Sequence, residues 1–292
     1  MPIKIKGVTH IYKKGTPFEK KALEDIFLNI ENGEILGIMG KSGSGKSTFL
    51  QLLNGLLRPC RGKIIVDDYD ITMIPADEIA AVRREVGLVF QFPEEQIFET
   101  DVYKEIAFGP KNLGIDEKKT FERVKTAMKL TGLEYVKFKD RRPNELSGGE
   151  KRRVGIADIL ALNPRYLLLD EPFAALDYEG RRKIYQSIKE LNQTRGTTTI
   201  IVSHNLEYLV PVCNRLLILA DGRVKLDIKI DEIALYIKEI KNLGVSPPLH
   251  HEVLYYLKEK GFNINVKVRT REEAAREIAK YLGTLKDEVK SG

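Results

Sequence analysis

Apolar and polar positions alternate along the first thirty residues of the chain. The segments "IKIKGVTHIY" (3–12) and "ALEDIFLNI" (22–30) place apolar side chains at nearly every second position, which is the period of a strand with one buried face. The segments "EILGIM" (34–39), "YLLLD" (166–170) and "TTTIIV" (197–202) are almost continuously apolar instead. Continuous apolar runs of this length are typical of strands buried on both faces of a parallel sheet.

Helical spacing of apolar residues replaces the strand pattern between these segments. The segment "KSTFLQLLNGLL" (46–57) fits one helix, and residues 92–164 are mostly helical. Within the latter stretch we expect helix breaks at Gly109-Pro110 and at 142–144, because Pro disfavours a continuing helix. The alternation of strands and helices predicts an α/β fold around a mainly parallel sheet, with residues 92–164 as a helical insertion.

The pattern changes again after the segment "RLLILADGRVKLD", which predicts a hairpin with Asp221-Gly222 as its turn. From about residue 231 three short amphipathic helices follow: "EIALYIKEIKNLG", "LHHEVLYYLKEKGF" and "TREEAAREIAKYLG". We therefore expect a main domain over 1–230 and a small C-terminal helical domain over 231–292. The pair His250-His251 suggests a metal site, but we expect it to be an incidental exposed pair.

Composition and charge indicate the kind of surface and the cellular compartment of the protein. The 292 residues carry a net charge of +6, and acids and bases are interleaved along the chain. This favours a solvated ionic surface over a surface for nucleic acid or anionic lipid. The two cysteines, Cys60 and Cys213, are far apart, which suits a reducing compartment. Because no apolar run approaches the about 20 residues of a membrane span and no signal-peptide core is present, we expect a cytosolic protein whose membrane association is peripheral.

The stretch "GIMGKSGSGKST" follows an apolar strand and opens a helix, and it fits the phosphate-binding P-loop pattern. Glycines allow positive φ angles and bring backbone N–H groups close to an anion. In this interpretation Lys46 reaches the β- and γ-phosphates and the Ser47 hydroxyl is a ligand of Mg²⁺. A plain Gly/Ser turn is the alternative, which the flanking strand and helix disfavour. The predicted ATP-binding residues of this loop are Gly40, Lys41, Ser42, Gly43, Ser44, Gly45, Lys46, Ser47 and Thr48.

Two further motifs are candidates for the same site: one supplies two carboxylates, and the other supplies the free backbone N–H groups of a helix start. In "YLLLDE" an apolar strand delivers Asp170 and Glu171 to its carboxyl end, where ligands bind in open α/β sheets. We expect Asp170 to hold Mg²⁺ and Glu171 to polarise the attacking water. An Asp-Glu pair that caps the turn at Pro172 is the alternative. In "LSGGE", Ser147 and Glu150 have capping-box spacing, which predicts a helix start. The two intervening glycines leave that helix end open to an anion.

These motifs and their order resemble those of the ATP-binding cassette (ABC) ATPases, over about residues 3–240. The resemblance implies a P-loop fold with a parallel core, an antiparallel β subdomain, a helical insertion and ATP and Mg²⁺ as cofactors. It assigns Tyr12 to stacking on adenine, Gln91 to sensing nucleotide and Mg²⁺, Asp177 to the D-loop, and His204 to the γ-phosphate and water. Taken alone, His204 suits a histidine satisfied in the core at a strand end. The chain departs from the family at Glu150, where Gln is commonest, and at Ala174, where Ser or Thr is usual.

The resemblance also implies a mechanism. In this family two cassettes face each other head to tail, and each ATP lies between the P-loop of one chain and the signature of the other. ATP binding closes the pair, and hydrolysis with product release opens it. The catalytic residues would be Glu171 and His204, and Mg²⁺ would contact Ser47, Gln91 and Asp170. The signature residues expected to act on the partner's ATP are Leu146, Ser147, Gly148, Gly149 and Glu150.

The segment "FQFPEEQIFETDVYKEIAFGPKNLG" (90–114), together with "FEKKALEDI" (18–26), looks like energy-coupling factor (ECF) ATPases of the A-prime type. Cobalt and nickel uptake ATPases are close relatives. This implies a second, usually different ATPase, a transmembrane coupling protein and a membrane subunit that captures a vitamin or metal ion, at the cytoplasmic face of the membrane, with no nucleic acid. The alternatives are an ABC ATPase of DNA maintenance or translation, which the ordinary insertion and the single cassette disfavour, and a regulator without turnover.

Two surface regions are candidates for partner contacts. Glu94, Glu95 and Glu99 cluster beside Gln91, and a basic residue of a membrane partner would fit between them. A solvated acidic turn is the alternative. The apolar positions of the C-terminal helices favour contact between the two ATPases, and packing onto the chain's own cassette is the alternative; these positions include Leu254, Leu257, Ile278 and Leu282.

Overall fold

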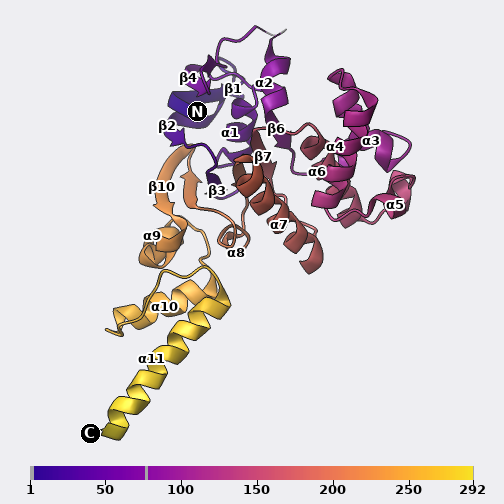
Figure 1. Cartoon of the computed structure of the whole chain (residues 1–292). Coiled ribbons are helices and arrows are strands. Elements are labelled where there is room, and N and C mark those ends of the chain that lie inside the picture. Colours follow the sequence, from indigo (N-terminus) through magenta and orange to yellow (C-terminus); the bar gives the residue numbers. More distant parts are fainter. Residues whose placement is uncertain (1–2, 76–77, 292) are drawn as a thin grey trace.

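The computed structural model describes residues 3–75 and 78–291 (Figure 1). Its N-terminal part is a four-stranded antiparallel sheet with the strand order β2-β1-β4-β5. The alternating pattern of the first thirty residues produces the two longest of these strands, and their apolar side chains face the interior. The strands are β1 (Ile3–Tyr12), β2 (Lys20–Ile30), β4 (Arg61–Val66) and β5 (Tyr69–Asp70).

A six-stranded sheet forms the centre of the molecule, in the order β10-β9-β3-β8-β7-β6. All neighbouring pairs are parallel except β9 and β10, which are joined by Asp221-Gly222 as the sequence predicts. Both turn residues have positive φ, 52° and 71°, as a two-residue hairpin turn requires. The strands are β3 (Ile35–Met39), β6 (Val86–Val89), β7 (Tyr166–Asp170), β8 (Thr198–Val202), β9 (Arg215–Ala220) and β10 (Arg223–Lys229).

The helices fall into a group around the sheet and a group beside it. Those around the sheet are α1 (Lys46–Leu53), α2 (Ile79–Glu85), α7 (Tyr178–Arg195) and α8 (Leu206–Leu209). The predicted insertion stands to one side (Figure 1). It contains the turn η1 (Pro93–Gln96), α3 (Val102–Asn112), α4 (Glu117–Leu130), α5 (Tyr135–Phe138), η2 (Pro143–Glu145) and α6 (Gly148–Ala161).

The expected break at Gly109-Pro110 is wrong, because α3 continues through both residues to Asn112. Pro110 lies in the last turn of the helix, where the missing N–H forfeits one backbone bond close to the helix end. The Pro110 ring is buried, so its packing offsets that loss. The break expected at 142–144 is present, since η2 separates α5 from α6.

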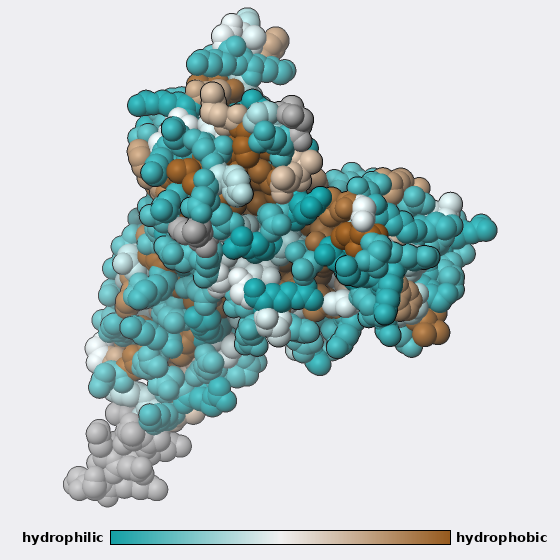
Figure 2. Space-filling view, turned by 45° about the horizontal axis from the view of Figure 1, so that its top comes forward, coloured by the Kyte–Doolittle hydropathy of each residue, from teal (hydrophilic) through white to brown (hydrophobic). Residues whose placement is uncertain are grey.

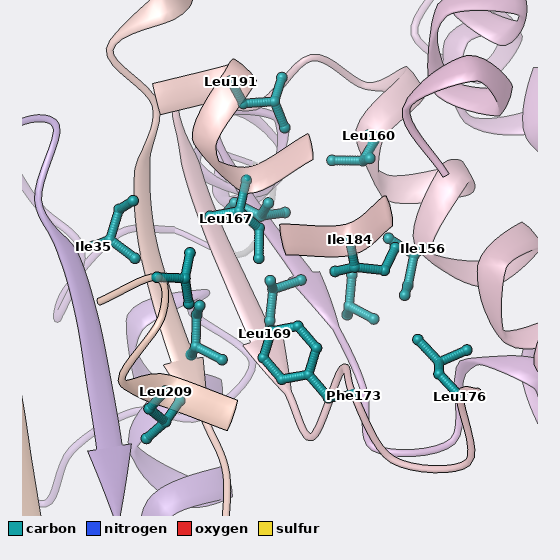
Figure 3. Packing of buried hydrophobic residues seen from close by; sticks show 14 of the residues in the cluster. Ile35, Ile156, Leu160, Leu167, Leu169, Phe173, Leu176, Ile184, Leu191 and Leu209 are labelled. Atoms are coloured by element: carbon teal, nitrogen blue, oxygen red, sulfur yellow. The ribbon is translucent and has the colours of Figure 1, made fainter. Parts of the chain in front are cut away.

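The core lies on both faces of the six-stranded sheet. Successive residues of β3 enter opposite clusters: Leu36 and Ile38 face the antiparallel sheet, and Ile35 and Met39 face α6 and α7. Figure 3 shows the second cluster, with Leu167 of β7 among side chains of α6 and α7. Burial of each such aliphatic side chain stabilises the fold by about 1.5–3 kcal/mol. The continuous apolar runs of the sequence are therefore explained by two covered sheet faces.

The C-terminal segment has two different packing environments. Its first part, η3 (Ile230–Leu235) and α9 (Ile237–Asn242), places Ile233 and Ile240 in the core cluster of the cassette. The rest, α10 (Leu249–Glu259) and α11 (Arg271–Ser291), projects away from the cassette (Figure 1). It has a small cluster of its own, formed by Ala234, Leu254, Ile264, Val266, Val268 and Ala274. The division at residue 231 remains a proposal. The separate cluster supports a small C-terminal unit, which Ala234 of η3 and the bonds from Arg269 to Asp231 and from Arg271 to Glu207 connect to the rest of the chain.

His250 and His251 do not form the exposed pair that we expect from the sequence. His251 is completely buried, and its Nε2 donates to the carbonyl of Val268 at 3.0 Å. Burial lowers the pKa of His251 to about 4, so the ring is neutral at physiological pH. Among the side chains that the structure describes, in residues 3–75 and 78–282, no group of three or more His, Cys, Asp or Glu is arranged to hold a metal ion.

The outer surface is largely hydrophilic. Figure 2 shows polar side chains over most of one face, with hydrophobic residues in small separate patches. This agrees with the solvated ionic surface that the charge pattern predicts. No helix in the described part of the chain is both long and apolar enough to cross a membrane.

Candidate active site

The P-loop forms a tight turn between β3 and α1, as predicted. Gly45 is the N-cap of α1 and has φ 103°, a conformation that favours glycine. A Cβ atom at Gly45 would lie 2.5 Å from the carbonyl oxygen of Ala22. The Lys46 ammonium curls back across the loop and donates to the carbonyls of Gly40 at 2.7 Å and Lys41 at 2.9 Å. The loop therefore holds its own lysine above the amides that would bind phosphate.

A cavity of about 300 Å³ opens above the P-loop. Five segments that are distant in sequence line it: Tyr12, P-loop residues between Ser42 and Thr48, Gln91, the pair Asp170-Glu171, and His204. The carboxyl ends of parallel strands meet at one edge of a sheet, which explains why the segments after β3, β6, β7 and β8 come together. Tyr12 is contributed by the end of β1 in the antiparallel sheet. Lys20 and Ala22 of β2 also line the cavity, and the sequence analysis did not find them.

Tyr12 is fixed at the rim of this cavity. Its hydroxyl lies 3.0 Å from Oγ1 of Thr48, and its ring contacts His10 edge to face with centroids 4.7 Å apart. The ring is thereby oriented by contacts on two sides. Its position beside the phosphate loop is compatible with the predicted stacking on adenine.

Glu171 and His204 form a hydrogen-bonded pair at the cavity. His204 Nδ1 lies 2.7 Å from Oε1 of Glu171, and the hydroxyl of Ser203 donates to Oε2 at 3.2 Å. Burial raises the pKa of Glu171, whereas the bonds from His204 and Ser203 lower it. The His204 side chain is 71% exposed, so the alternative of a histidine satisfied in the core is wrong. A buried carboxylate with an exposed imidazole beside it is suited to handling a water molecule and its proton.

The residues proposed for Mg²⁺ offer suitable oxygen donors. Burial raises the pKa of Asp170, and a hydrogen bond with Ser47 opposes that shift only in part. Gln91 lines the same cavity. Hydroxyl, carboxylate and amide oxygens are the donors that Mg²⁺ prefers, usually together with substrate phosphate. Burial lowers the pKa of Lys46, and the charges of Glu171 and Asp170 oppose that shift.

The signature lies at the start of α6 with the predicted capping box. Ser147 Oγ accepts from the Glu150 amide at 3.3 Å, and Glu150 Oε2 accepts from the Ser147 amide at 2.8 Å. A Cβ atom at Gly148 would meet nothing within 4 Å, so this helix end is bare. In the part of the chain that the structure describes, residues 146–150 do not line the cavity above the chain's own P-loop.

The D-loop connects the Glu171 strand to α7. Asp177 is the N-cap of α7, and its carboxylate accepts from the Gly180 amide at 2.7 Å. This bond satisfies one of the free N–H groups at the helix start. The predicted D-loop residue therefore has a defined structural role in addition to any role across a dimer.

The three predicted docking acids have different environments. Glu94 forms an ion pair with Arg152 of α6 at 3.3 Å. Glu95 is exposed on η1, and the backbone amide of Glu99 donates to Glu105 Oε2 at 2.7 Å. Two exposed aromatic side chains accompany them, Phe92 and Phe98. The turn therefore combines one carboxylate already paired within the chain with others that remain accessible.

Arg152 is a residue near the site that the sequence analysis missed, and Ser203 is another. Arg152 is 1% exposed, whereas its neighbour Arg153 is partly exposed on the same helix. Helical spacing from Gly155 and Ile156 would have placed position 152 on the buried face. Ser203 is buried at the end of β8, and only the assembled sheet places it beside Glu171.

Comparison with known proteins supports the same family. A family model described as "ABC transporter" matches residues 23–174. The energy-coupling factor transporter ATP-binding protein EcfA2 of Clostridium tetani is 45% identical over 96% of this chain and 97% of its own length. EcfA2 of Clostridium acetobutylicum is 46% identical over 98% of this chain and all of its own length.

Solved structures give the same result. A dimeric ATP-binding cassette bound to ADP and Pi is 34% identical, with a TM-score of 0.72, and covers 78% of this chain and 98% of its own length. The protein cbiO1 from Clostridium perfringens, part of the ABC transporter complex cbiONQ, is 34% identical with a TM-score of 0.73 and covers 88% and 98%. The chain belongs to the ABC transporter family of ATPases and, within it, to the energy-coupling factor transporter ATP-binding proteins.

Proposed function

We propose that the protein is the ATP-hydrolysing subunit of an ECF-type importer and that it drives uptake of a vitamin or metal ion from the cytoplasmic face of the membrane. The observation that carries this proposal is the meeting of the P-loop, Asp170, Glu171 and His204 at one edge of the sheet. The named relatives are transporter components, which favours import over DNA maintenance or translation. A cobalt/nickel-type importer remains the alternative, because cbiO1 is also similar.

Each residue of the cavity has a role in this proposal. P-loop amides and Lys46 bind the β- and γ-phosphates, and Tyr12 stacks on adenine. Ser47, Asp170 and Gln91 would hold Mg²⁺, which would neutralise charge on the phosphates when bound. Glu171 orients the attacking water and accepts its proton, while His204 holds Glu171 in place and contacts the γ-phosphate.

We further propose that the signature acts on the ATP of a second cassette. Two observations support this: the bare helix end at Gly148 and the absence of residues 146–150 from the lining of the chain's own cavity, as far as the chain is described. Dimer closure would bring the N–H groups of α6 to the γ-phosphate of the partner's ATP. The second cassette is a different chain in the proposed heterodimer.

The test of the transport proposal is purification of the tagged protein from native membranes, followed by identification of its partners. We expect a second ABC ATPase, a polytopic membrane protein and a small membrane subunit. ATP-dependent uptake by vesicles that contain this complex should be lost with the Glu171→Gln variant. Recovery of only nucleic acid or ribosomal partners would contradict the proposal.

We propose that the acidic turn beside Gln91 docks the membrane partner through a basic residue. Glu95 is the most accessible acid, and Glu94 contributes from its ion pair with Arg152. Changing Glu94, Glu95 and Glu99 to Gln should spare ATP binding by the free chain but weaken assembly, since a partner's charge would lose its match. The matched control changes three exposed acids of α4 and α5 to Gln, namely Glu117, Glu122 and Glu134. Equal assembly of both triple variants would identify the turn as merely solvated.

We propose that the C-terminal unit joins the two ATPases. Leu254 is buried within this unit, and Leu257 and Ile278 are partly buried against it, so these three offer a partner less surface. The accessible apolar side chains lie elsewhere on α10 and α11: Leu249, Val253, Tyr256 and Leu282. Changing Leu249, Val253 and Tyr256 to Ser should weaken nucleotide-free pairing in light scattering and leave ATP binding intact. Unchanged pairing would contradict this role.

A further inference from the structure

Arg152 is a buried arginine with three partners from different segments. One terminal nitrogen donates to the carbonyls of Gln91 at 2.7 Å and Glu171 at 2.6 Å, and the other lies 3.3 Å from Glu94. A guanidinium remains charged when it is buried, so its position is costly unless these contacts are kept. The side chain therefore ties α6 to the Gln91 turn and to the end of β7.

The backbone that Arg152 contacts is strained. Glu171 has φ 52°, a left-handed conformation that is unfavourable for a residue with a side chain. Its amide donates to the carbonyl of Val202 at 3.0 Å, and its carbonyl accepts from Arg152. With both backbone groups bonded, the carboxylate is directed to Ser203 and His204.

The helix that carries Arg152 is also pressed closely against the Gln91 turn. A Cβ atom at Gly155 would lie 2.6 Å from Cβ of Pro93 and 2.9 Å from its carbonyl oxygen. Only glycine permits this close approach of α6 to the turn at Pro93. The approach sets the distance from α6 to the groups that the Arg152 side chain contacts. Because α6 begins at the signature, Arg152 joins the helix of the signature directly to the carbonyls of Gln91 and Glu171.

We propose that Arg152 is a positioning residue for ATP hydrolysis, which holds the backbones of Glu171 and Gln91 in the arrangement that turnover requires. It acts through Glu171, so this inference rests on the catalytic role proposed above. By the same contacts it links the signature helix to the carboxylate of its own chain. An arginine that only stabilised the fold would affect unfolding without a selective effect on kcat.

Arg153 supplies the matched control. It is the next residue of the same helix and donates to the carbonyl of Gly132 at 3.1 Å, which anchors α6 at its other side. Its contact is of the same kind, a guanidinium to a backbone carbonyl, but it lies away from the cavity. Loss of this helix anchor should therefore affect stability without a selective effect on kcat.

The experiment measures kcat and KM for ATP in the purified complete complex. For Arg152→Met we expect kcat to fall by roughly 10- to 100-fold with KM changed by less than about threefold, since substrate binding does not involve Arg152. Arg152→Lys should recover part of kcat, because it keeps the charge but cannot reach all three partners. Arg153→Met should keep kcat within about twofold of the unchanged protein.

A kcat of Arg152→Met equal to that of Arg153→Met, or an effect on KM alone, would overturn the proposal. If Arg152→Met does not fold, Arg152→Lys decides: a lowered kcat at an unchanged melting temperature supports the proposal, and an unchanged kcat overturns it. Glu171→Gln is measured alongside. An active Glu171→Gln complex would refute the role of Glu171 and this inference with it, whereas an inactive one beside a fully active Arg152→Met complex would refute positioning alone.

Discussion

The P-loop and the Glu171 strand end lie in the same cavity but are built differently. The P-loop is held mainly by itself: Lys46 bonds to carbonyls six and five residues earlier in the chain. Glu171 takes its contacts from β8, from His204 and from α6. The phosphate-binding loop is thus built from local contacts, whereas the carboxylate proposed to act on water depends on contacts between segments that are distant in sequence.

We expect the largest effect, on ATP affinity, from a variant that distorts the backbone of the P-loop. Gly45→Ala forces a side chain onto φ 103° and toward the Ala22 carbonyl. We expect ATP affinity to fall by roughly a hundredfold or more, because the loop amides lose their arrangement. Gly15→Ala is the matched control, since Gly15 has φ 77° but open space around its Cβ position. Calorimetric titration that finds near-normal ATP binding by Gly45→Ala would show that the loop tolerates this strain.

A second variant should separate ATP binding by the isolated chain from closure of the cassette dimer. Gly148→Asp places a carboxylate at a bare helix start, where it is compatible with the helix dipole but would repel the γ-phosphate of the partner's ATP. ATP binding by the isolated chain should persist, and hydrolysis by the complex should fall by roughly a hundredfold or more. Loss of binding in the isolated chain would instead place the signature at its own nucleotide.

The smallest effect is expected from a single contact of Glu171. Ser203→Ala removes one hydrogen bond to the carboxylate, worth about 0.5–1.5 kcal/mol, which corresponds to a roughly two- to tenfold fall in kcat. This bond lowers the pKa of Glu171, so its loss raises that pKa. Because Glu171 must be ionised to accept a proton, the acidic limb of the kcat profile should move to higher pH. An acidic limb at the original pH would show that Ser203 does not influence Glu171.

The same contrast explains what could be predicted from the sequence. The P-loop, the capping box of Ser147 and Glu150, and the Asp221-Gly222 hairpin each depend on residues a few positions apart, and all three are present. Arg152 was missed because its three partners come from separate segments, and helical spacing marks position 152 as buried without showing what it contacts. The burial of His251 depends on the backbone of Val268, and the helix through Pro110 depends on tertiary packing that overrides the local preference of proline.

We expect Glu171 to be required for ATP hydrolysis but not for ATP binding. The most direct measurement is single-turnover ATP hydrolysis by the complete complex with Glu171→Gln, together with ATP affinity and the oligomeric state. If the partner ATPase has its own carboxylate, both chains are changed in the same complex. For this variant we expect ATP affinity within about threefold of normal, a trapped closed dimer, and hydrolysis slowed by roughly a hundredfold or more. Hydrolysis at a near-normal rate in the doubly changed complex would contradict it.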